Sequence, residues 1–160
     1  MELTTNRALA HIKQNNMSYV RIWIHAVWGT KARFPHFVGP VKNRFFEHIR
    51  DNAKEKGIYL SQINGHSEHV HCLFSLTAEQ TVAKVMQLLK GESSYWINKN
   101  EIVSREFEWA DEYFAVSVSE SQVKRVRQYI RNQEEHHRKK SWGEEVDEFL
   151  EKYGFDRMTG

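Results

Sequence analysis

The chain has 160 residues, of which 40% are hydrophobic, and its 23 basic and 21 acidic side chains give a formal net charge of only +2. This size suits one domain with a hydrophobic core and is too small for two ordinary domains. The single cysteine, Cys72, excludes an intrachain disulfide and a paired-cysteine zinc site, and no segment approaches a continuous apolar membrane span. We therefore expect a soluble, cytoplasmic protein whose residues 1–17 form a flexible leader rather than a signal peptide.

The first half of the chain alternates between strand and helix patterns. Apolar and polar residues alternate over 19–28, which predicts a half-buried strand. An apolar stripe with helical spacing follows over 40–57, with proline at its start and glycine at its end. Two further apolar runs, 58–63 and 69–76, are separated by Asn64-Gly65 and a polar stretch, so we expect adjacent antiparallel strands.

The second half predicts a helix, a strand and two more helices. Thr77 and Gln80 fit a capping box before a helical stripe that continues to Trp96. Residues 113–119 alternate as a strand, and Ser119 can cap a helix over about 123–133. The order of elements predicts an α+β, ferredoxin-like sandwich over 18–140, with an antiparallel sheet, helices on one face and a C-terminal helical tail over 141–160.

The most informative motif is His69-Val70-His71, which we place on a central strand of the sheet. Side chains two residues apart on a strand share a face and lie about 7 Å apart, close enough to converge on one metal ion. A histidine pair at this spacing is also compatible with an ordinary polar sheet face. The motif alone does not decide between these readings.

Tyr129 and Gln133 lie one helical turn apart in the predicted helix over 123–133. Taken alone, Tyr129 is better explained as a half-buried residue at the edge of an apolar stripe. Together with His69 and His71, however, the two residues offer an amide ligand and a phenol nucleophile for a phosphate held by a divalent ion. This donor set would suit Mg²⁺ or Mn²⁺ and suggests cleavage of a DNA strand.

Basic residues cluster around the predicted tyrosine helix despite the low net charge. Such a cluster is typical both of a nucleic-acid surface and of an ordinary solvated helix face. On the first interpretation we expect five side chains to contact phosphate: Lys31, Arg33, Lys90, Arg125 and Arg131.

Several segments resemble the single-tyrosine HUH (histidine, hydrophobic residue, histidine) transposases of small bacterial insertion sequences, including the REP-associated tyrosine transposases. The matching segments, from Tyr19 to Lys140, are Trp28-Gly29-Thr30-Lys31, Glu68-His69-Val70-His71, Lys90-Gly91-Glu92-Ser93-Ser94, Trp96-Ile97-Asn98, the run from Phe114 to Ser119, and Tyr129-Ile130-Arg131-Asn132-Gln133.

The resemblance implies a transposase that cleaves and rejoins single-stranded DNA and recognises hairpins at element ends. Tyr129 would form a 5′-phosphotyrosine intermediate, and His69, His71 and Gln133 would hold the divalent metal. Rejoining reverses cleavage, so no ATP is required. The resemblance also implies a homodimer in which the tyrosine helix can complete the site of the partner.

Two other functions use the same residues. A domesticated or inactive relative would act as a module that binds single-stranded DNA or RNA without a covalent step. Replication initiation or conjugative nicking would use the same HUH chemistry, but the chain shows no helicase or primase region and is small.

Overall fold

The fold is built on a four-stranded antiparallel sheet with strand order β2-β3-β1-β4. A computed structural model describes residues 19–153, so the predicted leader over 1–17 and the last residues of the predicted tail lie outside the described range. The strands are β1 (Ile22–Gly29), β2 (Tyr59–His66), β3 (His69–Leu76) and β4 (Phe114–Val118). The helices are η1 (Lys31–Arg33), α2 (Pro40–Glu55), α3 (Val82–Lys99), η2 (Glu120–Gln122), α4 (Val123–Arg131), α5 (Gln133–Lys139) and α6 (Trp142–Lys152).

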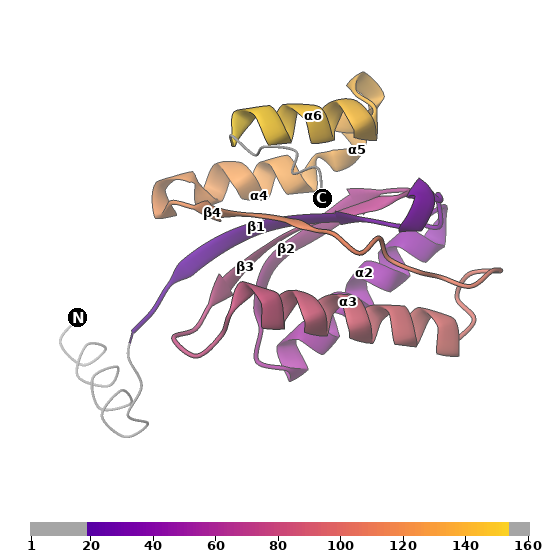
Figure 1. Ribbon diagram of the computed structural model, residues 1–160, viewed down its shortest axis with the longest axis horizontal. Helices are drawn as coiled ribbons and strands as arrows, with labels where there is room; N and C mark the ends of the chain where they lie inside the picture. Colours follow the sequence, from indigo (N-terminus) through magenta and orange to yellow (C-terminus); the bar gives the residue numbers. More distant parts are fainter. Residues whose placement is uncertain (1–18, 154–160) are drawn as a thin grey trace.

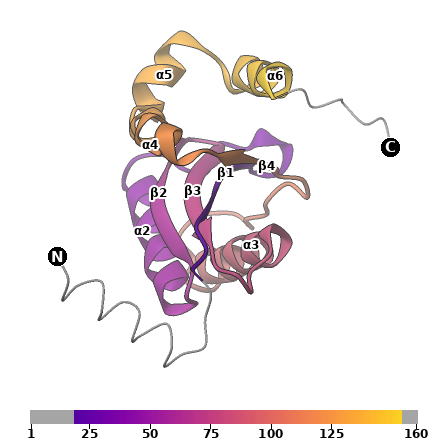
Figure 2. The ribbon, with the colours of Figure 1, turned by 90° about the vertical axis from the view of Figure 1, so that its left-hand side faces the viewer.

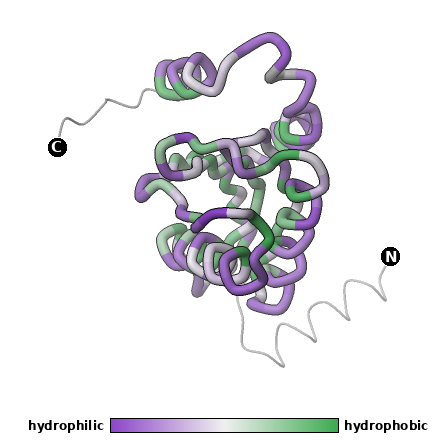
Figure 3. Tube along the Cα trace, turned by 90° about the vertical axis from the view of Figure 1, so that its right-hand side faces the viewer, coloured by the Kyte–Doolittle hydropathy of each residue, from purple (hydrophilic) through white to green (hydrophobic). Residues whose placement is uncertain are grey.

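Helices α2 and α3 cover one face of this sheet (Figure 1). Side chains alternate in direction along a strand, so every second residue of the central strands β1 and β3 faces these helices. The resulting main core combines strand residues with apolar residues of both helices, among them Ile24, Ala26, Trp28, Val70, Phe74, Phe45, Ile49 and Met86. Figure 3 shows that hydrophobic segments concentrate inside the fold and hydrophilic ones lie mainly outside.

The opposite face of the sheet lies under the C-terminal helices (Figures 1 and 2). Here Trp23 and Leu73 of the central strands pack against Val123 and Ile130 of α4 in a second, smaller core. Helices therefore lie on both faces, rather than on one face as the sequence suggested. The reason is that the alternating strands present large apolar residues to both faces, and both sets must be removed from water.

The predicted α+β, ferredoxin-like fold class is confirmed by the order of the elements and of the strands. The predicted position of the HUH motif on a central strand is also correct, because β3 lies between β2 and β1. The tail predicted from residue 141 contains α6, whose Ser141 caps the helix by accepting a hydrogen bond from the Glu144 backbone N–H.

The connection expected over 64–68 is shorter than predicted, because Asn64 and Gly65 belong to β2 and the turn lies at Ser67-Glu68. Gly65 has no positive φ and serves a different purpose. A Cβ atom at this position would lie 2.1 Å from the carbonyl oxygen of His69. Glycine is therefore required for the close approach of β2 to the start of β3.

Two helix boundaries also differ from the sequence-based expectation. Helix α3 is capped by Thr81, whose side chain accepts from the Lys84 backbone N–H, and not by Thr77. The single helix expected to carry Tyr129 and Gln133 is wrong, because α4 ends at Arg131 and α5 begins at Gln133. The Arg131 carbonyl accepts a hydrogen bond from Asn64 Nδ2 at 3.1 Å, which satisfies a helix-terminal acceptor from outside the helix.

Candidate metal and nucleophile site

His69 and His71 project from the sheet face that α4 and α6 cover. On the neighbouring strand β1, Gly29 lies opposite His69 and Val27 lies opposite His71. Both histidines are fully buried, with 0% and 1% of their surface exposed. The alternation of β3 sends Val70 into the main core, so the strand itself places the two imidazoles on one side.

Gln133 and Tyr129 reach the histidines from the helices above. Gln133 is fully buried, and its Oε1 lies 3.1 Å from His69 Nε2. The rings of Tyr129 and His71 have centroids 5.5 Å apart. The structure therefore brings the four residues singled out as nucleophile and ligands into one cluster within one chain.

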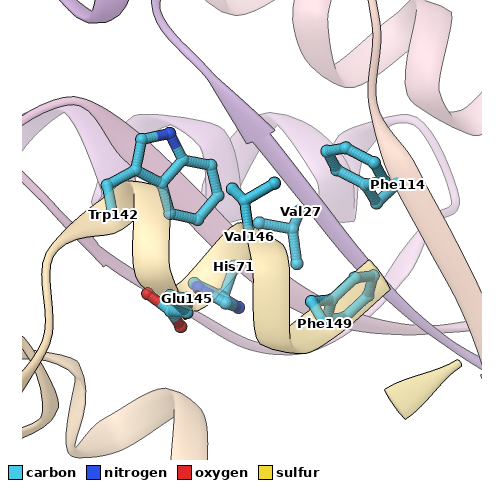
Figure 4. Close-up of a pocket in the computed structure, with 7 residues that line it drawn as sticks. All are labelled: Val27, His71, Phe114, Trp142, Glu145, Val146 and Phe149. Atoms are coloured by element: carbon cyan, nitrogen blue, oxygen red, sulfur yellow. Dashed lines mark ion pairs between the residues drawn. The ribbon is translucent and has the colours of Figure 1, made fainter. Parts of the chain in front are cut away.

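Helix α6 adds a carboxylate to this cluster that the sequence analysis missed. Glu145 points from α6 towards His71 (Figure 4) and is almost completely buried. Its Oε1 lies 3.0 Å from His71 Nε2, and its Oε2 lies 3.6 Å from His69 Nε2. The same Oε1 accepts a hydrogen bond from the Tyr129 hydroxyl. Glu145 therefore lies between the phenol and both imidazoles.

The charges of Glu145 and Tyr129 follow from these contacts. Burial alone would raise the pKa of Glu145, but the hydrogen bond and charge of His71 outweigh it and hold this pKa well below its usual range. The pKa of Tyr129 is raised, first by burial and then by Glu145. Glu145 is therefore an ionised carboxylate and Tyr129 a protonated phenol in this arrangement.

Each histidine is oriented by a second residue behind it. His69 Nδ1 donates to Glu68 Oε1 at 3.0 Å, and His71 Nδ1 lies 3.0 Å from His25 Nε2. Burial would raise the pKa of Glu68, but hydrogen bonds from His69 and Ser67 lower it to about 2. Burial, followed by the charge of His71, lowers the pKa of His25 to about 3, so His25 is neutral. These contacts direct both Nε2 atoms towards Glu145 and Gln133.

The donor set fits a divalent metal ion. His69 Nε2 lies 3.1 Å from the Gln133 carbonyl oxygen and 3.6 Å from Glu145 Oε2, so an imidazole nitrogen, an amide oxygen and a carboxylate oxygen meet at one point. Ligand atoms of His69, His71 and Glu145 also lie within 4.8 Å of one another. Such separations are about twice a metal-ligand bond of 2.0–2.4 Å.

Helix α6 also closes this cluster from outside. The Trp142 ring stacks on the His69 ring, with centroids 4.0 Å apart and planes at 7°. Trp142 also packs over Gly29, where a Cβ atom would make an ordinary contact of 3.7 Å with Trp142 Nε1. Between α6 and the sheet lies a small void of about 10 Å³, lined by the residues in Figure 4.

The five basic residues expected to bind DNA do not form one surface. Lys90 lies on α3, on the far side of the sheet, and donates to the carbonyls of Ala110 and Asp111 at 2.8 and 3.0 Å. These hydrogen bonds give Lys90 a structural role. That Lys90 also contacts DNA stays a prediction. Lys31 is exposed and pairs with Glu108 at 3.0 Å.

The other three basic residues lie on the same side of the sheet as the cluster. Arg125 and Arg131 are exposed on α4. Arg33 lies next to the first turn of α6, since a Cβ atom on Gly143 would be 3.5 Å from its Nη1. For these three residues, too, contact with DNA stays a prediction.

Comparison with known proteins identifies the family. The model of the IS200-like transposase family matches residues 18–133, which include β1 to β4, α4 and every residue expected to act as ligand or nucleophile. The chain belongs to the IS200-like transposases. Helix α6, with Glu145 and Trp142, lies beyond the matched residues.

Individual relatives agree with membership of the IS200-like family. The chain is 28% identical over 115 residues to the ISDra2 transposase TnpA of Deinococcus radiodurans, covering 68% of this chain and 81% of that protein. A candidate transposase from Deinococcus radiodurans, known as a crystal structure, shares 25% identity and a TM-score of 0.59 over 72% of this chain and 93% of its own.

A more distant structure supports the fold alone. It is a REP-associated tyrosine transposase bound to a REP hairpin, with 12% identity and a TM-score of 0.56 over 76% of this chain and 70% of that one. As for membranes, no helix within residues 19–153 has the length and apolar character needed to cross a bilayer.

Proposed function

We propose that this IS200-like transposase cleaves and rejoins single-stranded DNA through a covalent bond between Tyr129 and a 5′-phosphate. The observation that carries the proposal is the convergence of a tyrosine hydroxyl, two imidazoles and an amide in one buried cluster. DNA hairpins at the ends of the element are the proposed substrate, by analogy with the hairpin bound to the REP-associated relative.

In the proposed reaction the Tyr129 oxygen attacks the scissile phosphorus. The bond from phosphorus to the 3′-oxygen of the upstream nucleotide breaks. The phenol loses its proton and the departing 3′-oxygen takes one up, so the products are a 5′-phosphotyrosine and a free 3′-hydroxyl. Rejoining is the reverse, with a 3′-hydroxyl attacking the phosphotyrosine. One phosphoester bond replaces another in each direction, so no nucleotide cofactor is consumed.

His69, His71 and Gln133 would hold the divalent metal, Mg²⁺ or Mn²⁺, and the Glu145 carboxylate is within reach as a further oxygen ligand. When bound, such an ion neutralises charge on the phosphate and orients it for in-line attack. Glu68 and His25 keep the ring nitrogens directed at this point.

The test uses labelled single-stranded DNA from both flanks of the gene, incubated with the full chain and Mg²⁺ or Mn²⁺. We expect a metal-dependent covalent adduct on denaturing gels, with Tyr129 identified by peptide mapping. Tyr129→Phe should abolish the adduct, whereas Tyr95→Phe, which changes an exposed tyrosine on α3, should leave it intact. An adduct that persists in Tyr129→Phe would refute the proposed nucleophile.

Binding of DNA without any adduct, with both ions and both flanks, would instead favour a binding module descended from a transposase. The oligomeric state needs a separate measurement, by sedimentation of the chain with and without DNA. The homodimer implied by the family resemblance is a part of the proposal, although Tyr129, Gln133 and the histidines already meet within one chain.

A further inference from the structure

A cavity of about 450 Å³ lies beside Tyr129, between the edge strand β4, helix α4 and helix α6. Pockets that bind small ligands typically measure 300–1,000 Å³. The cavity reaches the surface, since Gln122 and Arg125 on its wall are exposed. The residues that the argument uses are Val118 and Ser119, Gln122 and Arg125, and Phe149 and Tyr153.

The wall of this cavity offers the groups that recognise a nucleotide. Arg125 on α4 and Lys152 on α6 supply positive charge for a phosphate. The rings of Phe149 and Tyr153, with centroids 4.9 Å apart, supply a surface for a planar base. On the opposite wall, Ser119 and the Gln122 amide can exchange hydrogen bonds with base edges. Ser117 also lies along this wall, but it pairs with Ile24 of the main core, so its side chain is on the other face of the sheet.

The position of the cavity relates it to the proposed chemistry. Tyr129 and Glu145 line it, whereas His69, His71 and Gln133 do not. Glu145 therefore separates the cavity from the two imidazoles, and it is the side chain in contact with the Tyr129 hydroxyl. If the Glu145 carboxylate turns aside, a phosphate that enters from the cavity meets Tyr129 and the metal ligands together.

We propose that this cavity binds one nucleotide of the single-stranded DNA, directly next to the phosphate that Tyr129 attacks. The inference rests on the proposed function, which it extends by naming where the strand is held. One wall comes from α6, which lies beyond the residues matched by the family model. The outer wall of the nucleotide site is thus contributed by a part of this chain that the family model does not describe.

The first experiment measures binding without chemistry, so that it does not depend on cleavage. In the full chain carrying Tyr129→Phe, with EDTA present, a fluorescent oligothymidine is titrated and its anisotropy recorded. Arg125→Ala should weaken binding about tenfold, as expected for loss of one charge-assisted phosphate contact. Lys124→Ala is the matched control, because it removes the same charge from the adjacent exposed residue, which does not line the cavity.

A twofold or smaller effect of Lys124→Ala beside the tenfold effect of Arg125→Ala supports the site. Equal effects of the two variants overturn it, because they would reflect general attraction of DNA by positive charge. Neither result bears on the adduct experiment, which uses the chain with Tyr129 in place and a metal ion present. The nucleotide site and the proposed cleavage can therefore fail separately.

The second experiment locates the base directly. Oligothymidine with one thymine replaced by 5-iodouracil is irradiated with the Tyr129→Phe chain, and the crosslinked peptide is mapped. We expect crosslinks at Phe149 or Tyr153, and we expect Val118→Phe, which enlarges a side chain on the cavity wall, to remove them while the circular dichroism spectrum is retained. Crosslinks that map only to α2, α3 or β2 would overturn the proposal.

Discussion

His25 Nε2 lies 3.0 Å from His71 Nδ1, while Glu145 contacts the other nitrogen of the same His71 ring. His25 is buried and neutral, so its Nε2 can accept the Nδ1 proton of His71 and keep the Nε2 atom of His71 directed at the cluster. His25 was not among the residues that the sequence analysis singled out for the site. Its position makes it an orienting residue for a proposed ligand.

The first prediction is that His25→Phe weakens metal binding. Phenylalanine keeps a ring in the same space but removes the nitrogen that fixes the orientation of His71. Loss of such a contact typically lowers metal affinity by about 10- to 100-fold. The measurement is calorimetric titration of the metal-free chain with Mn²⁺. His48→Gln, a change in a histidine that pairs with Glu92 between α2 and α3, is the control and should leave the affinity unchanged.

The second prediction concerns the dependence of stability on pH. The pKa of His25 is lowered from 6.5 to about 3 in the folded chain, so between these values the unfolded chain binds more protons. The free energy of unfolding therefore falls as the pH drops from about 6.5 towards 3, by at most about 1.4 kcal/mol per pH unit from this group. Urea unfolding at about pH 7 and about pH 5 should show a smaller loss on acidification in His25→Phe than in the wild type. Parallel losses in the two proteins would contradict a neutral His25 in the folded state.

The third prediction is that Glu145→Gln tightens binding of single-stranded DNA to the metal-free chain. The Glu145 carboxylate lies between His71 and Tyr129, where the proposed reaction needs a phosphate. Two like charges about 4 Å apart repel by about 1 kcal/mol in water and about 4 kcal/mol near a protein surface. Glutamine keeps the shape of the side chain and removes this repulsion.

Anisotropy titration of labelled single-stranded DNA measures the effect of Glu145→Gln, and Glu144→Gln supplies a control of equal charge. Glu144 is the preceding residue on α6 and is exposed. Its replacement changes the net charge in the same way but alters nothing between His71 and Tyr129. A gain in affinity shared by both variants would show that overall charge, rather than the place of Glu145, determines binding.

Strand periodicity explains why so much of the cluster was predictable. The two-residue repeat in β3 places His69 and His71 on one face whatever the rest of the fold does. The same repeat in β1 places Trp23 and His25 on that face as well. The two-residue repeat of the strand sequences therefore predicts which strand residues face the site.

Gly65 and Glu145 were missed or misread because their roles depend on distant residues. Gly65 follows an asparagine and so resembles a turn, but it is needed because β3 passes too close for a side chain. Glu145 reaches His71 only because the chain turns back after α5, which no local pattern encodes. A signal did exist: Trp142, Glu145 and Phe149 share one helix face, and a carboxylate amid aromatic residues of a docking face needs a partner.

The fourth prediction tests whether packing against α6 or strand propensity in β1 determines the stability of variants at Gly29. Gly29 ends β1 opposite His69, and a Cβ atom there would lie 3.4 Å from the Glu68 carbonyl oxygen and 3.7 Å from Trp142 Nε1. These are ordinary contact distances, so Gly29→Ala should change the free energy of unfolding little. The two extra methyl groups of Gly29→Val must displace Trp142 from His69, and such overpacking typically costs about 1–3 kcal/mol. Strand propensity predicts the opposite, since valine favours strands and glycine does not. Urea unfolding of both variants decides between them: a valine variant as stable as the alanine variant would show that Trp142 does not pack on His69 in solution.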